Sequence, residues 1–392
     1  MSAHYSLPAV RIAATALALC IGMTVLTGCW SASDVQNKSY VKALGIDYED
    51  GEFIVYAQFL DFTSIAKSES GGRREGKPST WVGRGKGKTI NMASDQLYNT
   101  SQIYVTWGHI SALVFTERAL KAKGFEMIEM VNRFPEIRYN TWIYSTQSDL
   151  LDILSTEAFF NMTSLLSILH EPMPNYKQNS TLPPIEMFKF IARYNEPDQP
   201  SYMPSISLNQ DQWRMSKKPA PQLMLNGAYF ESHDGSKTFI SKKKLEGYQW
   251  MQKETNRAPL TVEKNGIVYA NLSLGRPSVD IRPVLTDGKA RFHITVGLIG
   301  AMYEYNEPIS YEEMISIAEK AVAEQIERVY LEGVRNGVDL FQLGRALRLK
   351  SPVMWKQLTD NGNRLLVTPE SIEKLTVHID IPYNGKYKRL TD

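Results

Sequence analysis

Cysteine is scarce in this sequence, because only Cys20 and Cys29 occur among its 392 residues. Cys20 lies inside an apolar run near the N-terminus, so Cys29 is the sole thiol from residue 29 onward. A single thiol excludes an intramolecular disulfide and a cysteine-based metal site in that part of the chain. Stability therefore has to come from packed apolar cores, which a chain of this length can build.

Long apolar runs and an excess of charge are also missing. After Cys29 the longest apolar run is about residues 294–303, whereas a membrane-spanning helix needs about 20 residues. The formal net charge of the whole chain is +2, so there is no global basic field that would favour nucleic acid as a partner. We therefore expect a water-soluble body after residue 28.

Motifs for catalysis or cofactor binding are absent from the sequence pattern as well. Residues 83–89 (GRGKGKT) come close to a phosphate-binding loop, but the pattern needs a glycine where Val82 stands, so we predict a strand-to-helix turn. There is no HExxH pair and no Gly-x-Ser-x-Gly elbow. The remaining histidines are dispersed along the chain: His109, His170, His233, His293 and His378. We expect no metal, no cofactor and no enzymatic activity.

The N-terminus has the pattern of an export signal. Arg11 precedes an uncharged, largely apolar stretch over residues 12–26, which is about 22 Å long as a helix and short for a permanent anchor. The stretch ends in Leu26-Thr27-Gly28-Cys29, a branched apolar residue and two small residues before a cysteine. This lipobox pattern predicts a signal peptide over residues 1–28, cleavage after Gly28 and lipidation of Cys29.

Lipidation would explain how a chain without a later spanning segment stays at a membrane. The Cys29 thiol would accept a diacylglyceryl group and the new α-amino group an acyl chain. One acyl chain gives marginal binding of about 10⁴ M⁻¹, whereas two or more give a stable anchor. We expect the protein on the outer face of the cell membrane, held by lipid; an ordinary secretory signal or an uncleaved membrane helix is the alternative.

The periodicity predicts a mixed α/β fold in three domains. A hairpin over residues 40–62, strands near 109–115 and 138–145, and helices over 89–97, 117–134, 155–170 and 184–194 suggest an N-terminal α/β domain over 29–200. Five prolines among polar residues in 195–221 mark a boundary. Short strands at 223–230 and 237–240 suggest a small middle domain over 201–260.

The C-terminal domain, residues 261–392, has the clearest pattern. Strands are predicted at 266–274, 278–285, 290–303 and 374–381, and an amphipathic helix at 311–334. Ser310 and Glu313 form a capping box at the start of this helix. We predict an antiparallel-rich sheet covered by the long helix, because that arrangement buries both apolar faces.

Several short motifs together resemble the Ger(x)C spore-germination lipoproteins, the C subunits of nutrient germinant receptors. Each motif is weak alone, but their order and the lipobox cover essentially the whole chain. The motifs are Cys29-Trp30, Leu44-Gly45-Ile46-Asp47, Trp107-Gly108-His109-Ile110, Leu113-Val114-Phe115, Glu136-Ile137-Arg138, Leu245-Glu246-Gly247-Tyr248 with Trp250, Gly337-Val338-Asp339-Leu340-Phe341-Gln342-Leu343-Gly344 and the stretch from Pro352 to Trp355.

This resemblance implies a non-enzymatic subunit anchored on the spore inner membrane through Cys29. It also implies two integral membrane partners, the A-type and B-type receptor subunits, and a role in assembly and germination signalling. The sequence departs from the family where Ser31-Ala32-Ser33-Asp34 replaces an acidic residue directly after the Cys-Trp pair, and at Leu340-Phe341-Gln342. The alternative function is a solute-binding lipoprotein of a transporter, which needs two similar lobes.

Overall fold

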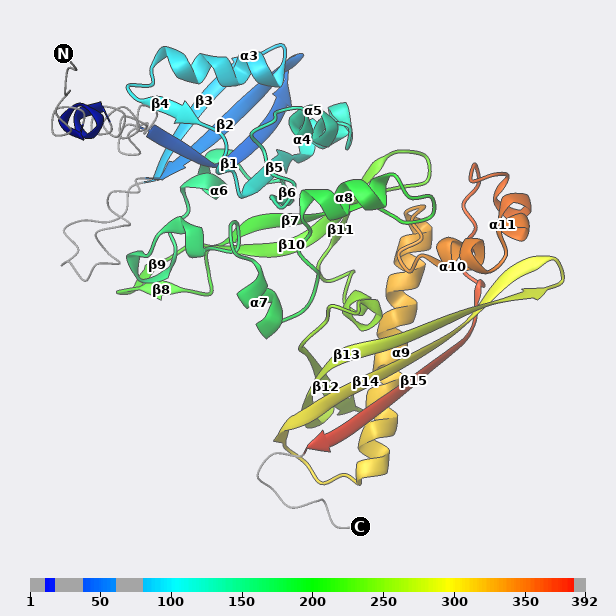
Figure 1. Cartoon of the computed structure of the whole chain (residues 1–392). Coiled ribbons are helices and arrows are strands. Elements are labelled where there is room, and N and C mark those ends of the chain that lie inside the picture. The colour runs from blue at the N-terminus through cyan, green and yellow to red at the C-terminus, as the bar shows by residue number, and fades with distance from the viewer. Residues whose placement is uncertain (1–10, 18–37, 61–79, 384–392) are drawn as a thin grey trace, which may run out of the picture. The chain divides into compact units, whose positions relative to one another are not determined.

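The computed structural model describes residues 11–17, 38–60 and 80–383 (Figure 1). The chain forms two units, Met1–Lys38 and Ser39–Asp392. In the first unit, residues 11–17 are helical. Within the described ranges, no helix combines the length and the apolar character that crossing a membrane requires. The predicted cleavage position Gly28 and the predicted lipidation site Cys29 lie outside the described residues.

A nine-stranded mixed sheet forms the first part of the larger unit. Its order is β11-β10-β7-β6-β5-β1-β2-β3, and β4 pairs with β1. The central neighbours β1, β5, β6 and β7 run parallel, and antiparallel strands extend the sheet on both sides. The strands are β1 (Lys38–Glu49), β2 (Glu52–Leu60), β3 (Thr80–Gly87), β4 (Tyr104–Thr106), β5 (Ala112–Thr116), β6 (Trp142–Thr146), β7 (Tyr202–Asn209), β10 (Gln222–Glu231) and β11 (Lys237–Ser241).

Both faces of this sheet are covered, as the buried strand β5 shows. Leu113 and Phe115 belong to one buried cluster, whereas Ala112 and Val114 belong to another on the opposite face. A strand buried on both sides reads as a continuous apolar run, which is the pattern seen at 112–115. The helical segments of this part are α3 (Ile90–Asp95), η2 (Gln96–Asn99), α4 (Glu117–Lys123), α5 (Met127–Asn132), α6 (Leu150–Ser155), η3 (Phe159–Asn161), η4 (Ser164–Leu166), α7 (Met173–Gln178) and α8 (Met187–Tyr194).

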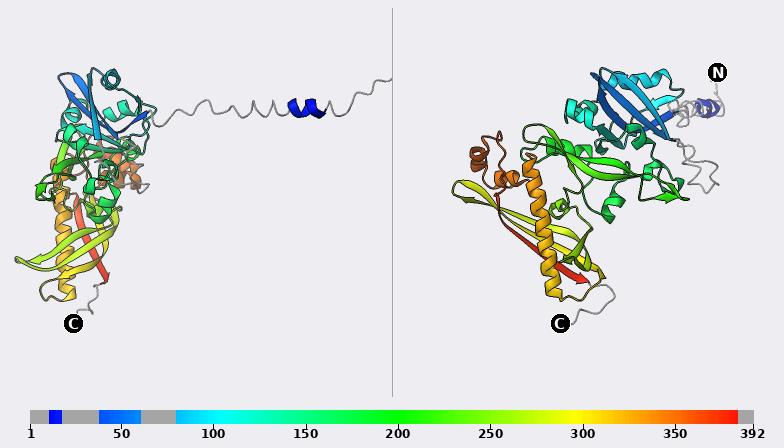
Figure 2. Two further views of the ribbon diagram at one scale, coloured as in Figure 1. Left: turned by 90° about the vertical axis from the view of Figure 1, so that its left-hand side faces the viewer. Right: turned by 180° about the vertical axis from the view of Figure 1, so that it is seen from behind.

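A second sheet of four strands follows in the order β12-β13-β14-β15. Its first three strands are antiparallel, and β15 joins β14 in parallel. The long helix α9 (Tyr311–Arg335) lies along the sheet, as Figure 2 shows, and buries a stripe that includes Ala318, Val322 and Ile326. The other elements are β8 (Arg214–Met215), β9 (Lys218–Pro219), η5 (Tyr248–Met251), β12 (Ala258–Lys264), β13 (Ile267–Thr286), β14 (Lys289–Tyr305), α10 (Leu343–Lys350), α11 (Pro352–Thr359) and β15 (Ile372–Tyr383).

The mixed α/β class is confirmed, as are the elements with the strongest local signals. The hairpin predicted for 40–62 is β1–β2, and the predicted C-terminal sheet is covered by its long helix. The Ser310 side chain accepts a hydrogen bond from the Glu313 amide at 3.2 Å, which caps α9 as expected. The turn predicted for 83–89 is shorter than expected, because residues 83–87 belong to β3 and only Lys88 and Thr89 link it to α3. The Thr89 hydroxyl accepts a hydrogen bond from the Met92 amide at 3.1 Å.

The helix predicted for residues 155–170 is wrong. The structure has only the two short turns η3 and η4 there, and Phe160 adopts a left-handed conformation with φ 57°. The Thr163 hydroxyl accepts a hydrogen bond from the Leu165 amide at 3.4 Å, a local bond that competes with helix formation. Apolar spacing alone could not reveal this competition.

Two other predicted elements are divided differently. The helix predicted for 117–134 breaks into α4 and α5 at Gly124, where φ is +66°. The strands predicted at 266–274 and 278–285 are one strand, β13, with an irregular register between Gly275 and Ser278. A Cβ at Gly275 would lie 2.1 Å from the Asn256 carbonyl oxygen, so a close backbone approach explains the glycine.

Hydrogen bonding in the first sheet continues across residue 200. β7, β10 and β11 all come from 202–241 and extend the sheet that the earlier strands begin. The predicted division into domains at 29–200, 201–260 and 261–392 stays a prediction, because strands that share one sheet do not show which segments fold independently. The predicted signal segment 1–28 falls mostly on residues outside the described ranges.

Candidate functional site: a basic pocket beside the 337–344 turn

The motif at 337–344 begins as the C-terminal cap of α9. The Val338 amide donates to the Gly333 carbonyl at 2.9 Å, and the Gly337 amide donates to the Val334 carbonyl at 3.0 Å. Together with φ +68° at Gly337, these bonds form a Schellman motif. A Cβ at Gly333 would lie 2.7 Å from the Val338 carbonyl oxygen, so this glycine lets the chain fold back onto the helix.

The second half of the motif is a tight turn built around a buried carboxyl group. The Asp339 Oδ2 atom accepts a hydrogen bond from the Gly344 amide at 2.7 Å, and Gln342 has a left-handed conformation with φ 58°. Asp198 lies against Gly344, where a Cβ would be 2.9 Å from its Oδ1 atom. Burial raises the pKa of Asp339 to about 6, and the nearby Asp198 adds to this rise; burial also raises the pKa of Asp198.

This turn is attached to segments that follow α8 and β10. The His233 amide donates to the Gly337 carbonyl at 2.8 Å. The Ser232 hydroxyl donates to the Asn336 carbonyl at 2.7 Å, and Arg348 on α10 forms an ion pair with Glu196. The 337–348 region therefore connects the C-terminal helices to the end of the first sheet.

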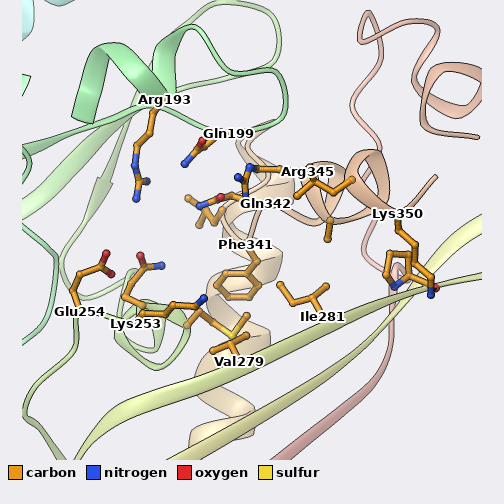
Figure 3. Close-up of a pocket in the computed structure, with 16 residues that line it drawn as sticks. Arg193, Gln199, Lys253, Glu254, Val279, Ile281, Phe341, Gln342, Arg345 and Lys350 are labelled. Carbon is orange, nitrogen blue, oxygen red and sulfur yellow. The ribbon is translucent and has the colours of Figure 1, made fainter. Parts of the chain in front are cut away.

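A cavity of about 570 Å³ opens beside the turn (Figure 3). Phe341 projects toward its centre, Val279 and Ile281 of β13 lie beneath it, and Arg193 and Gln199 point toward it from the opposite side. The floor is apolar, because Leu340 and Phe341 are buried and the β13 side chains are partly buried. The wall and rim are polar. A ligand with an apolar body and a polar end matches this lining.

Positive charge dominates the lining of the pocket. Four cations contribute, namely Arg193, Lys253, Arg345 and Lys350, against the single acid Glu254. In the part of the chain that the structure describes, none of these cations forms an ion pair, and Arg193 Nη1 and Arg345 Nε are buried without a hydrogen-bond partner. Guanidinium donors in such surroundings are stabilised by an anion. The arrangement can therefore hold a small anion.

The other motifs of the sequence support the packing around this region. Gly247 has φ +117°, and a Cβ there would lie 2.5 Å from the Gln325 carbonyl oxygen on α9. The Trp250 Nε1 group donates to the Gln325 Oε1 atom at 2.6 Å. Asp47 is buried and accepts bonds from Thr116 and Arg118. These motif residues hold elements together, whereas the 337–344 motif also lines the pocket.

His170 and His293 have separate partners in the structure. His170 is buried between the Ser111 hydroxyl at 2.7 Å and the Gln58 Oε1 atom at 2.9 Å, and burial lowers the pKa of His170 to about 3. His293 pairs with Glu373 at 2.8 Å. Among the described residues, no three His, Cys, Asp or Glu side chains could hold a metal ion together.

Sequence reasoning missed the pocket itself. Its four cations come from α8, the segment after η5 and α10, which are far apart in the chain. No spacing rule joins such positions. The motif at 337–344 was a usable signal, since it marks the turn from which the pocket extends, but it does not indicate the charge of the lining.

Comparisons with known proteins match almost the whole chain. The family model described as the spore germination protein N-terminal domain matches residues 31–208, and the spore germination B3/GerAC-like C-terminal model matches residues 226–384. The spore germination protein KC of Bacillus subtilis (strain 168) is 20% identical over 386 residues, which cover 91% of this chain and 92% of that protein. The spore germination protein YfkR of the same organism is 19% identical over 290 residues, with 74% and 73% covered.

A solved structure shares the fold. The crystal structure of the GerBC protein aligns with a TM-score of 0.50 and 15% sequence identity, and the alignment covers 90% of this chain and 99% of that chain. At this identity the likeness supports the mixed α/β architecture. With both family domains matched in order, the chain belongs to the GerAC-like family of spore germination proteins, the Ger(x)C family that its motifs resemble.

Proposed function

We propose that the protein is the C subunit of a spore nutrient germinant receptor, held by lipid at Cys29 on the outer face of the spore inner membrane. The observation that carries this proposal is the match of both family domains over residues 31–208 and 226–384. A mature lipoprotein would begin at Cys29, the last residue of the lipobox Leu26-Thr27-Gly28-Cys29, and the first match begins two residues later, at residue 31.

Anchoring would confine the protein to the membrane surface without a spanning helix. A diacylglyceryl thioether and an N-acyl chain on Cys29 supply more than the two acyl chains that a stable anchor needs. The protein would then meet partners that are held at the same surface, and the partners we propose are the A-type and B-type integral membrane subunits. In this role the chain assembles with the membrane subunits and helps to transmit the germination signal, and it catalyses no reaction.

The alternative, a solute-binding lipoprotein of a transporter, needs two similar lobes around one cleft. The two large sheets of this chain have nine and four strands and different strand orders. Their helical coverings differ as well, since among the described residues only the smaller sheet has a helix of 25 residues. This inequality favours the receptor subunit over the transporter protein.

Metabolic labelling with a fatty acid analogue tests the anchor. Cys29→Ser should abolish the label and release the protein from sedimented membranes, because the acceptor sulfur is gone. Cys20→Ala is the matched control and should label fully, since Cys20 leaves with the signal peptide. A Cys29→Ser chain that still labels and still sediments would contradict the proposal.

A further inference from the structure

The β8–β9 hairpin projects beyond the end of β7 (Figure 1). Its two central residues, Ser216 and Lys217, have φ values of 47° and 72°, the pattern of a type I′ turn. Arg214 pairs with Pro219 across the hairpin, and the Ala220 amide donates to the Trp213 carbonyl at 2.9 Å. The turn and the pairing therefore give the hairpin a defined register.

Apolar side chains cluster on this projection and on the neighbouring turn η3. The Trp213 ring packs edge-to-face against Phe159 with ring centroids 4.8 Å apart. Phe160 is 85% exposed and Met215 is 56% exposed. Between the hairpin and η3 lies an apolar cavity of about 650 Å³. An exposed apolar surface of this kind marks a membrane or protein interaction site.

Phe160 is held outward by an unfavourable backbone conformation. Its φ of 57° and ψ of 30° lie in the left-handed region, which glycine adopts without strain and a phenylalanine does not. A large apolar side chain is therefore kept on the surface although both its backbone and its exposure disfavour it. Strain of this kind points to a function for the side chain.

Cations lie next to the apolar residues of the hairpin. Arg214, Lys217 and Lys218 are exposed, and none of them forms an ion pair within the described ranges. Residues 212–221 contain no acidic residue, whereas Asp211 precedes them and the acids Asp152 and Glu157 also line the cavity. Aromatic and apolar side chains with adjacent cations fit the boundary between acyl chains and phosphate groups.

We propose that this aromatic hairpin surface, composed of residues 159–160 and 213–218, binds the headgroup region of an anionic bilayer. The inference rests on the proposed function, which places the chain at a membrane. In the sequence, residues 30–37 separate Cys29 from the start of β1 at Lys38. The first residues of β1 and the β8–β9 hairpin lie toward the same side in Figure 1 and in the reverse view of Figure 2.

Vesicle binding of the unlipidated chain tests the surface directly. The probe is residues 29–392 with Cys29→Ser, and the vesicles are phosphatidylcholine alone or phosphatidylcholine with phosphatidylglycerol at 3:1. Sedimentation should show binding to the anionic vesicles that weakens in high salt, because cations at the surface contribute. The assay needs no lipid anchor, so it still tests the surface if the natural protein proves not to be acylated. Absence of binding to the anionic vesicles overturns the inference.

Charge variants test the role of the lysines. Lys217→Gln with Lys218→Gln should weaken binding to anionic vesicles by about fivefold for each cation removed. The matched control, Lys243→Gln with Lys289→Gln, removes two exposed lysines elsewhere and should bind as the parent does. Equal weakening in both pairs would mean that only the net charge matters and would overturn the site.

Apolar variants test insertion. Phe160→Gly with Trp213→Ala should weaken vesicle binding by more than about tenfold, because two large apolar groups no longer leave water. Phe160→Gly alone should keep or raise the melting temperature, since it relieves the left-handed strain. Tyr303→Ala, at another exposed aromatic on β14, is the control and should leave binding unchanged. If Phe160→Gly unfolds the chain while binding persists in Trp213→Ala, Phe160 is structural and the inference fails.

A probe at the turn separates a bilayer from a protein partner. A solvent-sensitive fluorophore on Ser216→Cys, in the otherwise cysteine-free Cys29→Ser chain, should shift to shorter wavelength on anionic vesicles alone. No shift with lipid, together with loss of the membrane subunits from pull-downs of the Phe160→Gly, Trp213→Ala chain, would assign the surface to a protein partner and overturn our proposal.

Discussion

Asp339→Asn should remove a stability loss that grows with pH. The carboxyl group is buried beside Asp198, and burial raises the pKa of Asp339 to about 6 from an ordinary value of 3.8. Each pKa unit corresponds to about 1.4 kcal/mol, so ionisation lowers the free energy of unfolding by at most about 3 kcal/mol. The asparagine Oδ1 atom can still accept the bond from the Gly344 amide, and no charge is formed.

The direction of the pH effect follows from the raised pKa. Below about pH 4 the Asp339 carboxyl is protonated in both the folded and the unfolded state. The free energies of unfolding of the parent and of Asp339→Asn should therefore differ little there. Between about pH 4 and pH 6 the unfolded chain releases its proton first, and the free energy of unfolding of the parent falls. Above about pH 6 the full cost is present, and Asp339→Asn should be more stable by about 1–3 kcal/mol.

Urea unfolding followed by tryptophan fluorescence at pH 4, 5, 6 and 7.5 measures this difference. Asp287→Asn, in the exposed β13–β14 turn, is the matched control and should track the parent at every pH. A difference between parent and Asp339→Asn that is the same at pH 4 and pH 7.5 would refute the reasoning, and so would a variant less stable than the parent at pH 7.5.

Three further predictions concern the packing and the pocket. Gly247→Ala should lower the free energy of unfolding by about 2 kcal/mol or more, seen as a lower melting temperature, because the new Cβ meets the Gln325 carbonyl; an unchanged value contradicts this. Arg118→Gln should cost about 1–2 kcal/mol by urea unfolding, because the buried Asp47 loses its ion pair, although the exposed arginine limits the effect. Pyrophosphate should raise the melting temperature of the parent and have little effect on Arg193→Gln; equal shifts would exclude the pocket as the anion site.

The sequence predicted those elements whose caps, apolar positions and turn residues lie close together along the chain. The helix α9 has its capping residue Ser310, its apolar stripe and its terminating Gly337 within residues 310–337, so its start and end could be predicted from the sequence. The hairpin β1–β2 likewise has alternating strands around Asp50-Gly51. Gly124 shows the limit of this reading, because a single left-handed residue divides a helix whose apolar spacing continues through it.

Long-range arrangements could not be predicted from spacing. Asp198 and Asp339 meet beside Gly344, although the segments that carry them are more than a hundred residues apart. The cations of the pocket and the aromatic side chains around Trp213 also converge only after folding. Phe160 shows a further reason. Its backbone is left-handed and its ring is exposed, whereas a phenylalanine in a sequence is expected to have a negative φ and a buried side chain.

We propose that the protein works at the membrane surface, held by its lipid anchor, in a receptor with integral membrane partners. The most direct measurement is affinity purification of the tagged full-length protein from detergent-solubilised spore membranes, with mass spectrometry of what copurifies. We expect two integral membrane receptor subunits in amounts comparable to the bait, and an N-terminal peptide that begins at an acylated Cys29. A preparation that contains neither subunit, and in which the N-terminal residue is unmodified, would contradict the proposed function.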